Sequence, residues 1–330
     1  MTDRKKRMLF ASPAFFGYEN DIKRAVESNG IVVDYFDERP SNSSLAKALF
    51  RIGGGSAQAL VARHFRRILD ATRLQTYDYV LVVKGEVVPL GFLQELRRRN
   101  PDAHFVYYSF DAIPAGSNCT RIFGEFDRLF SFDPEDVKAY PQLEFKPLFY
   151  APEFQLSGTA PDRQYELSFV GTMHSDRRKF VTNLFTAFAR TYSFFYMPAR
   201  WYFFFRKYIK RDFAPVAWSE VSFIKLGKAE VASVFRSSTA VLDLQRTEQS
   251  GLTMRTFEVL ASGAILITGN QSIKDSDIYD ATRVVVVDDY DSPDASIRLK
   301  AELDKMGPVL GAPEGFEKHA VTNWVRDFFN

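Results

Sequence analysis

The sequence predicts an α/β protein with two domains, each built around an open parallel sheet. The chain has 330 residues, which is longer than a typical single core. Short apolar runs alternate with segments of helical periodicity along its length, as strands and crossover helices do in parallel sheets. Hydrophobic residues make up 46% of the chain and charged residues 25%, a composition that indicates a globular protein.

The first domain is expected to cover residues 1–152. Its first strand is the apolar run Met8–Ala11, and a helix over 19–28 follows after a loop. Asn29 and Gly30 end that helix, because both residue types tolerate the left-handed conformation. The other expected strands of this domain are Ile31–Phe36, Tyr79–Val83, His104–Tyr108, Arg128–Phe132 and Lys146–Phe149, with helices at 45–52, 57–74, 92–99 and 134–140.

Residues 153–312 are expected to form the second domain, beginning in a hinge over 152–163. This half repeats the alternation of strands and helices with fewer units, so a second parallel sheet is predicted. Two sheets that face each other would leave a cleft. The closing segment, residues 313–330, has a helical pattern. The expected strands are Leu167–Val170, Ser193–Tyr196, Val241–Leu244, Ile265–Thr268 and Val284–Val287.

A glycine turn in the second domain carries the strongest functional signal. Gly251, Leu252 and Thr253 follow the expected strand 241–244 and precede a helical segment. Unpaired backbone N–H groups and the positive end of the helix dipole make such a position an anion site. Arg255, one turn into the helix, adds a permanent charge that can hold a phosphate with two hydrogen bonds.

Glu258 lies a further turn along the same helix. Its carboxylate can accept hydrogen bonds from ribose hydroxyls, so the run as a whole indicates a nucleoside diphosphate site. A purely structural interpretation of the spacing stays open. In that interpretation Gly251 only closes a turn, and Arg255 and Glu258 form a solvated ion pair three residues apart.

The run from Gly251 to Glu258 resembles the nucleotide-sugar site of glycosyltransferases with the GT-B fold. The resemblance is to a bacterial family tied to capsule, lipopolysaccharide and spore-coat polysaccharides, and it covers most of the chain. It implies two Rossmann-like domains, a glycine turn that meets the donor diphosphate, and a last helix that packs back on the N-terminal domain. Glu258 matches the glutamate that holds the donor ribose. Many retaining members carry another glutamate eight positions earlier, where this chain has Ser250, so the stereochemistry of transfer stays open. Ser250 is kept among the candidate donor-binding residues.

The start of the second domain extends this resemblance. The expected strand 167–170 ends at Gly171, in what looks like the first glycine turn of a donor domain. Basic residues that follow such a turn commonly meet the donor diphosphate in related enzymes. The resemblance therefore implies that Arg177 and Arg178 bind the diphosphate and that His174 contacts the donor sugar or phosphate, although each could also be a surface residue.

Acceptor residues are expected in the first domain, just past the ends of strands. Tyr18 and Glu19 follow the first strand, Lys84 follows the third, and Asp111 follows the fourth. A carboxylate at a strand end can reach the hydroxyl that attacks the donor, so Asp111 is the candidate general base, and Lys84 could hold an acceptor anion. Asp111 could equally cap a turn. Asp111 and Glu258 are the two candidate catalytic residues.

Residues 194–211 concentrate aromatic and basic side chains. On a helical wheel Trp201, Phe204, Phe205, Tyr208 and Ile209 share one face, and the basic residues gather opposite, with Phe203 among them. Such a helix could lie in a membrane interface and approach a lipid-linked acceptor. It could instead pack against the second sheet with its basic face in water.

Composition excludes several other classes of protein. The net charge of +2 gives no reason to propose nucleic acid as a partner, and the single cysteine, Cys119, cannot form an internal disulfide. The N-terminus lacks an apolar core of signal-peptide length, so a cytoplasmic location is expected. His64, His104 and His319 do not show metal-ligand spacing, and neither a metal nor a cofactor is predicted.

The prediction is therefore a cytoplasmic hexosyl- or related glycosyltransferase, peripheral to the inner face of the membrane if 194–211 binds lipid. It would use a nucleoside-diphosphate sugar as donor and a surface polysaccharide or lipid-linked oligosaccharide as acceptor. A nucleotide-sugar epimerase and a non-catalytic nucleotide-sugar-binding or scaffold protein are the alternatives. An epimerase would form product without any acceptor.

Overall fold

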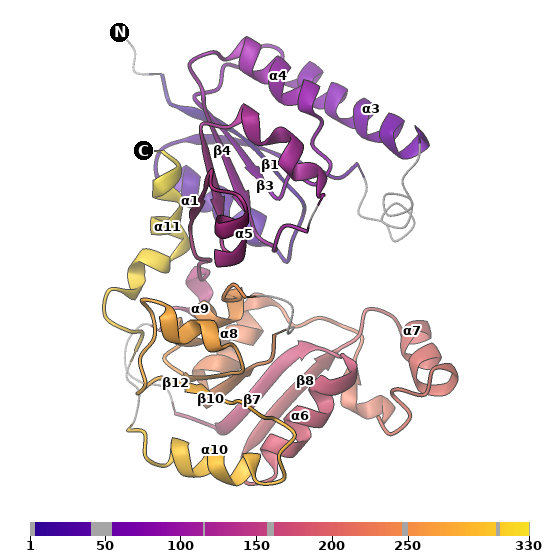
Figure 1. The fold of residues 1–330 in the computed structure, drawn as a ribbon, viewed down its shortest axis with the longest axis vertical. Coiled ribbons are helices and arrows are strands. Elements are labelled where there is room, and N and C mark those ends of the chain that lie inside the picture. The colour runs from indigo at the N-terminus through magenta and orange to yellow at the C-terminus, as the bar shows by residue number, and fades with distance from the viewer. Residues whose placement is uncertain are drawn as a thin grey trace. The chain divides into compact units, whose positions relative to one another are not determined.

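The computed structural model describes residues 4–40, 55–114, 116–156, 162–245, 250–307 and 311–329 (Figure 1). The chain forms two compact units. Unit 1 contains residues 1–148 and 318–330, and unit 2 contains residues 149–317. The boundaries expected from the sequence fall at 152 and 312, whereas the units divide after 148 and after 317.

Unit 1 is built on a parallel sheet that has six strands within the described ranges, in the order β2-β1-β3-β4-β5-β6. All five residues of β3 are buried, as expected for an inner strand covered on both faces. The strand order reverses beside β1, so the loops after β1 and β3 leave the sheet in different directions. The strands are β1 (Arg7–Ser12), β2 (Val32–Asp37), β3 (Tyr79–Val83), β4 (His104–Ser109), β5 (Arg128–Ser131) and β6 (Leu143–Phe145).

The helices of unit 1 begin and end where their local chemistry requires. Helix α4 (Leu90–Arg99) ends in three arginines, which the negative end of the helix dipole favours. Helix α5 (Pro134–Ala139) starts with proline, and the Asp133 carboxylate caps it by accepting from the Glu135 N–H at 2.9 Å. The other helices are α1 (Tyr18–Ser28), α3 (Gly55–Ala71) and the 3₁₀ helix η1 (Asn118–Glu125).

The closing segment of the chain packs within unit 1 as short helices. The expected helix over 315–328 is broken, because Ala320 is extended with φ −64° and ψ 135°. The Trp324 indole N–H donates to the Pro147 carbonyl at 2.8 Å, and the buried Lys146 ammonium forms an ion pair with Asp327. The segments are η6 (Phe316–His319), which crosses from unit 2, α11 (Val321–Trp324) and η7 (Val325–Phe328).

Unit 2 has a second parallel sheet, with six described strands in the order β12-β11-β10-β7-β8-β9. Counted within the unit, this is the order 3-2-1-4-5-6 of dinucleotide-binding sheets, with its switch point between β7 and β10. Its helices are α6 (Ser175–Phe185), α7 (Arg200–Phe204), α8 (Lys228–Arg236), α9 (Met254–Ala261) and α10 (Ala295–Leu303). The strands are β7 (Tyr165–Thr172), β8 (Thr191–Tyr196), β9 (Val221–Ser222), β10 (Ser238–Asp243), β11 (Ile265–Thr268) and β12 (Val284–Val286).

Three further elements differ from the sequence prediction. The edge strand expected at 146–149 is wrong, because β6 ends at Phe145 and Pro147 has no N–H to continue the ladder. The two-residue strand β9 was not predicted. The strand expected at Ser193–Tyr196 is confirmed as part of β8, whereas the helix that the wheel assumed over 200–211 ends at Ile209 and is a π-helix from Phe205. No helix in the described ranges has the length and apolarity needed to cross a bilayer.

Candidate functional site in unit 2

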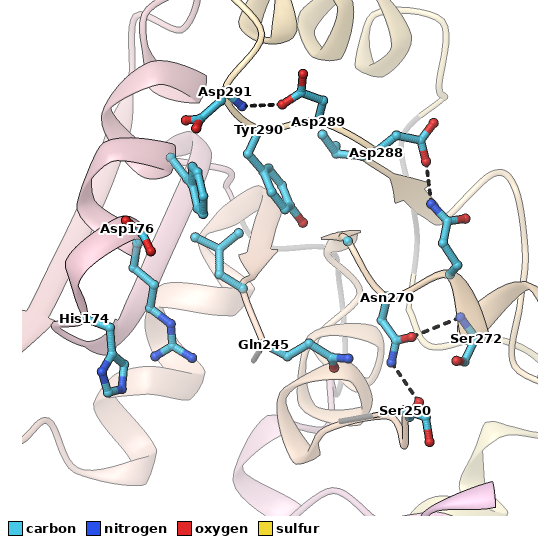
Figure 2. Close-up of a pocket in the computed structure, with 16 residues that line it drawn as sticks. His174, Asp176, Gln245, Ser250, Asn270, Ser272, Asp288, Asp289, Tyr290 and Asp291 are labelled. Atoms are coloured by element: carbon cyan, nitrogen blue, oxygen red, sulfur yellow. Dashed lines mark hydrogen bonds between the residues drawn. The ribbon is translucent and has the colours of Figure 1, made fainter. Parts of the chain in front are cut away.

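A cavity of about 950 Å³ lies at the switch point of the unit 2 sheet (Figure 2). Its walls are the loops that follow β7, β10, β11 and β12, which all leave the carboxyl edge of a parallel sheet. Ligands of open α/β sheets bind at this edge, at the point where the strand order reverses. The position of the cavity therefore marks it as the binding site of this unit.

Three residues that the sequence assigned to the donor line this cavity: His174, Arg177 and Ser250. His174 lies in the turn between β7 and α6, and Arg177 lies in the first turn of α6, where its guanidinium donates to the Thr172 carbonyl at 3.2 Å. Ser250 comes from the far side of the switch point, directly before Gly251. His174 and Ser250, which are 76 positions apart, are thus brought to one cavity by the β7–β10 pairing.

The turn at the start of α9 is held in place by a buried carboxylate. Asp243 ends β10 and is 2% exposed. Its Oδ2 accepts from the hydroxyls of Thr253 at 2.8 Å and Thr256 at 3.0 Å. Because the Thr253 hydroxyl is used in this way, it does not cap the helix whose first residue follows it. The backbone N–H groups at this terminus are therefore not covered by the side chain that would normally satisfy them.

Arg255 and Glu258 lie on the same helix but outside the cavity wall. The Arg255 Nε is buried and has no hydrogen-bond partner among the described residues. A guanidinium nitrogen in that state is costly unless a ligand supplies an acceptor. Glu258 is buried at 4% exposure, and its proposed contact with ribose stays a prediction.

The other residues that the sequence assigned to binding of the donor substrate do not line the cavity. The Arg178 guanidinium donates to Glu220 at 2.7 Å, and Arg178 does not line the cavity. At Gly171 a Cβ atom would lie 2.6 Å from the Phe169 ring, so this glycine is needed for packing within β7. Gly251, Leu252 and Thr253 form the turn beside the cavity without lining it.

Much of the cavity wall was not predicted from the sequence. Asn270 and its neighbours follow β11, and the Asn270 side-chain amide donates to the Ser250 carbonyl at 3.1 Å. A second group follows β12. These residues come directly after strand ends, so the rule that selected Asp111 in unit 1 could have found them. The unpredicted lining residues are Asp176, Phe180, Leu244, Gln245, Gly269, Asn270, Gln271, Ser272, Val287, Asp288, Asp289, Tyr290 and Asp291.

Tyr290 forms an aromatic wall with Phe180, their ring centroids 5.5 Å apart. Figure 2 shows the Tyr290 side chain directed into the cavity. The Tyr290 hydroxyl is buried and has no hydrogen-bond partner in the described part of the chain, and burial raises its pKa. Gly269 makes room for it, since a Cβ there would lie 2.8 Å from that hydroxyl. The hydroxyl therefore lies at the cavity wall without a hydrogen-bond partner among the described residues.

Carboxylates outnumber cations around the cavity. Asp291 is paired with Lys179 at 2.7 Å, and Asp288 accepts a hydrogen bond from Gln271. Each of these two carboxylates therefore already has one partner within the protein. Acidic walls suit ligand groups that donate hydrogen bonds, such as the hydroxyls of sugars. A diphosphate is instead suited to Arg177 and to the start of α9.

No group of three or more His, Cys, Asp or Glu side chains suited to holding a metal occurs in the ranges that the structure describes. The expectation of a metal-independent site stays a prediction.

Unit 1 brings two of its predicted acceptor residues together. The Lys84 ammonium lies 2.6 Å from the Asp111 carboxylate and 3.2 Å from Glu86. Burial alone would lower the pKa of Lys84, but the two carboxylates outweigh it and the pKa is raised. The backbone of Lys84 is also unusual, because its φ of 75° is a strained value for a residue with a side chain. The Tyr107 hydroxyl holds this backbone by donating a hydrogen bond to the Lys84 carbonyl at 2.9 Å. Strain fixed in this way is common at functional sites.

The other two acceptor candidates lie at the start of α1. Glu19 is buried, and its carboxylate accepts from the Phe15 N–H at 2.8 Å and from the Asn20 amide at 3.0 Å. It therefore fixes its own loop. Tyr18 is half-buried beside Phe15, and a role for it in acceptor binding stays a prediction.

Residues 203–302 match the family model described as glycosyl transferase-like. This part of the chain is glycosyltransferase-like. It runs from α7 to α10 and supplies most of the loops around the cavity. The resemblance to glycosyltransferases that the sequence predicted is confirmed at this level. No curated protein matches the chain.

Solved structures match over nearly the whole chain. An α,α-trehalose-phosphate synthase (UDP-forming) from Burkholderia xenovorans, in complex with glucose-6-phosphate, is 11% identical, with a TM-score of 0.58; the match covers 98% of this chain and 100% of that one. The N-terminal domain of Candida albicans trehalose-6-phosphate phosphatase is 10% identical, with a TM-score of 0.60 and coverage of 100% and 97%. At these identities the likeness concerns the fold. The predicted GT-B-like class with two Rossmann-like units is thereby confirmed.

Proposed function

We propose that this protein transfers a glycosyl group, a hexose or a related sugar, from a nucleoside-diphosphate sugar to a carbohydrate acceptor. The observation that carries the proposal is the cavity at the switch point of unit 2, beside the start of α9 and within reach of loops from the glycosyl transferase-like segment. That position combines space for a nucleotide with backbone N–H groups for its phosphates.

In this proposal each side of the cavity has its own role. Arg177, Arg255 and the α9 terminus stabilise the diphosphate, whose negative charge grows as the bond to the sugar breaks. The Tyr290 hydroxyl and the acidic residues after β12 bond hydroxyl and amine groups of the nucleoside and the sugar. Glu258 holds the ribose only if the donor reaches beyond the cavity wall.

Unit 1 would bind the acceptor substrate. Asp111 is about half exposed, so its carboxylate can accept the proton of an attacking hydroxyl. Lys84 orients that carboxylate through their 2.6 Å contact. We propose a growing surface polysaccharide or a lipid-linked oligosaccharide on the cytoplasmic side as the acceptor. This fits the resemblance to families that build capsule, lipopolysaccharide and spore-coat polymers.

The change Asp111→Asn tests the catalytic assignment. It removes the base and keeps the side-chain size, so kcat for transfer should fall by about 10²-fold or more while donor affinity stays the same. Asp102→Asn is the matched control, because Asp102 is exposed before β4, at the opposite end of that strand. Transfer is followed by release of nucleoside diphosphate with a panel of sugar acceptors. Equal kcat values for the Asp111 and Asp102 variants would contradict the role of Asp111. Conversion of the donor without acceptor would instead indicate an epimerase.

A further inference from the structure

A patch of exposed apolar side chains lies on the helical segment after β8. Trp201 is 73% exposed and Ile209 is 63% exposed, and Phe204 and Tyr208 between them are each at least half exposed. Trp201 and Phe204 belong to α7, and the other two belong to the π-helix that continues it, Phe205–Ile209. Figure 1 shows α7 on a loop that extends beyond the strands β7 and β8.

The segment is firmly anchored from its inner side. Phe203 is fully buried and packs edge-on against Trp218, with ring centroids 4.8 Å apart. The Lys207 ammonium donates to the Ala214 carbonyl at 2.8 Å, and Arg206 is paired with Asp212. The exposed residues are therefore held outward by a folded loop, and their exposure does not come from a frayed helix.

Positive charge surrounds these apolar residues. Residues 194–211 contain five basic and no acidic side chains. Arg206 and Lys207 are used in the internal contacts, whereas Arg200, Lys210 and Arg211 are exposed around the patch. Helices that lie in a membrane interface share this composition, with Trp and Phe among the headgroups and cations near anionic lipid.

We propose that this patch, formed by Trp201, Phe204, Tyr208 and Ile209 with Arg200, Lys210 and Arg211, docks unit 2 on an anionic lipid bilayer. A bilayer fits better than a protein partner for two reasons. The patch is a short projecting helix and not a broad face, and protein interfaces are depleted of lysine at their cores. The proposal does not depend on whether the protein transfers sugar.

The test uses the full chain and sedimentation with vesicles. Wild-type protein should bind phosphatidylglycerol vesicles and leave them as salt rises, and it should bind phosphatidylcholine vesicles much more weakly. Trp201→Ser with Phe204→Ser should lower the partition coefficient at least tenfold, and Lys210→Gln with Arg211→Gln should lower it for anionic vesicles only. Ile297→Ser is the matched control, since Ile297 is 67% exposed on α10 of the same unit. This change should leave the partition coefficient for both kinds of vesicle as it is in the wild type.

A second measurement does not need a variant that weakens binding. Acyl-chain-brominated lipids should quench the fluorescence of wild-type protein more than that of Trp201→Phe, because Trp201 would enter the bilayer. Absence of binding to anionic vesicles, or equal quenching in the two proteins, would overturn the proposal. A self-association that the Trp201 and Phe204 changes abolish, without vesicle binding, would also overturn it and identify a protein interface.

Discussion

Replacing Arg255 by alanine is expected to weaken nucleoside diphosphate binding by about tenfold to a hundredfold, or roughly 1.4 to 2.8 kcal/mol. Its Nε is buried without a hydrogen-bond partner among the described residues, so the native state already bears the cost of desolvating it. A phosphate oxygen would supply the missing acceptor with a charge-assisted hydrogen bond. Isothermal titration with UDP, GDP, ADP, CDP and TDP measures the effect.

Arg178→Ala is the matched control for this prediction. Arg178 is also an arginine of unit 2 that the sequence assigned to the diphosphate, but its guanidinium already has an acceptor in Glu220. Its loss should leave nucleotide affinity within about twofold of the wild type. If Arg178→Ala weakened binding and Arg255→Ala did not, the diphosphate would lie on the α6 side of the cavity and the role of α9 would be wrong.

The second large effect concerns a buried carboxyl group in unit 1. Glu38 follows β2 and is fully buried, and no side chain in the described part of the chain hydrogen-bonds its oxygens. Burial has the largest effect on the pKa of Glu38 and the charge of Glu86 the next, and together they raise it from 4.5 to about 8. The charges of Arg39 and Lys84 and the backbone of Gly85 act in the opposite direction. Glu38 therefore keeps its proton at neutral pH in the folded protein.

The sign of the pH dependence follows from this shift. Between pH 4.5 and about 8 the folded state holds a proton that the unfolded state has lost. The free energy of unfolding of unit 1 should therefore fall as pH rises through this window, by up to about 1.4 kcal/mol per pH unit from this group. Glu38→Gln has no proton to lose, so its stability should change much less with pH over the same range.

The fluorescence of Trp324 can follow the unfolding of unit 1. It is the only tryptophan of this unit, since the other two of the chain's three are Trp201 and Trp218. Denaturant titrations would use the background Trp201→Phe with Trp218→Phe. Glu86→Gln is the control, because it keeps the buried carboxyl and should preserve most of the pH dependence. If the free energy of unfolding changed with pH equally in Glu38→Gln and in its parent, Glu38 would be ionised in the folded state.

The sequence predicted the fold because parallel strands are continuous apolar runs. Tyr79–Val83 and Ile265–Thr268 were predicted with the bounds that β3 and β11 have. Strands β7 and β10 located the functional edge, since His174 and Arg177 come after β7, Ser250 comes after β10, and all three line one cavity. Residues after β11 and β12 were overlooked, because Asn270 and Tyr290 belong to no motif and only their position after a strand marks them.

Other features depend on tertiary packing that periodicity does not show. The helical wheel placed Phe203 among the basic residues, yet Phe203 is buried and the apolar face around Trp201 is exposed. The wheel assumes 3.6 residues per turn, whereas the segment becomes a π-helix after Phe204 and is held by Phe213 and Trp218 from later in the chain. Burial of Glu38 likewise comes from the packing of distant elements and leaves no local signature.

The central claim is that a nucleoside diphosphate binds in the unit 2 cavity, and photo-crosslinking tests it most directly. The wild-type protein would be irradiated with the azido derivatives of UDP, ADP and GDP, with and without excess unmodified nucleotide, and the modified peptides identified by mass spectrometry. The account predicts adducts that unmodified nucleotide suppresses, within the segments 174–180, 269–272 or 287–291, which contain most of the residues that line the cavity. Suppressible adducts confined to unit 1, or to parts of unit 2 away from these loops, would contradict it.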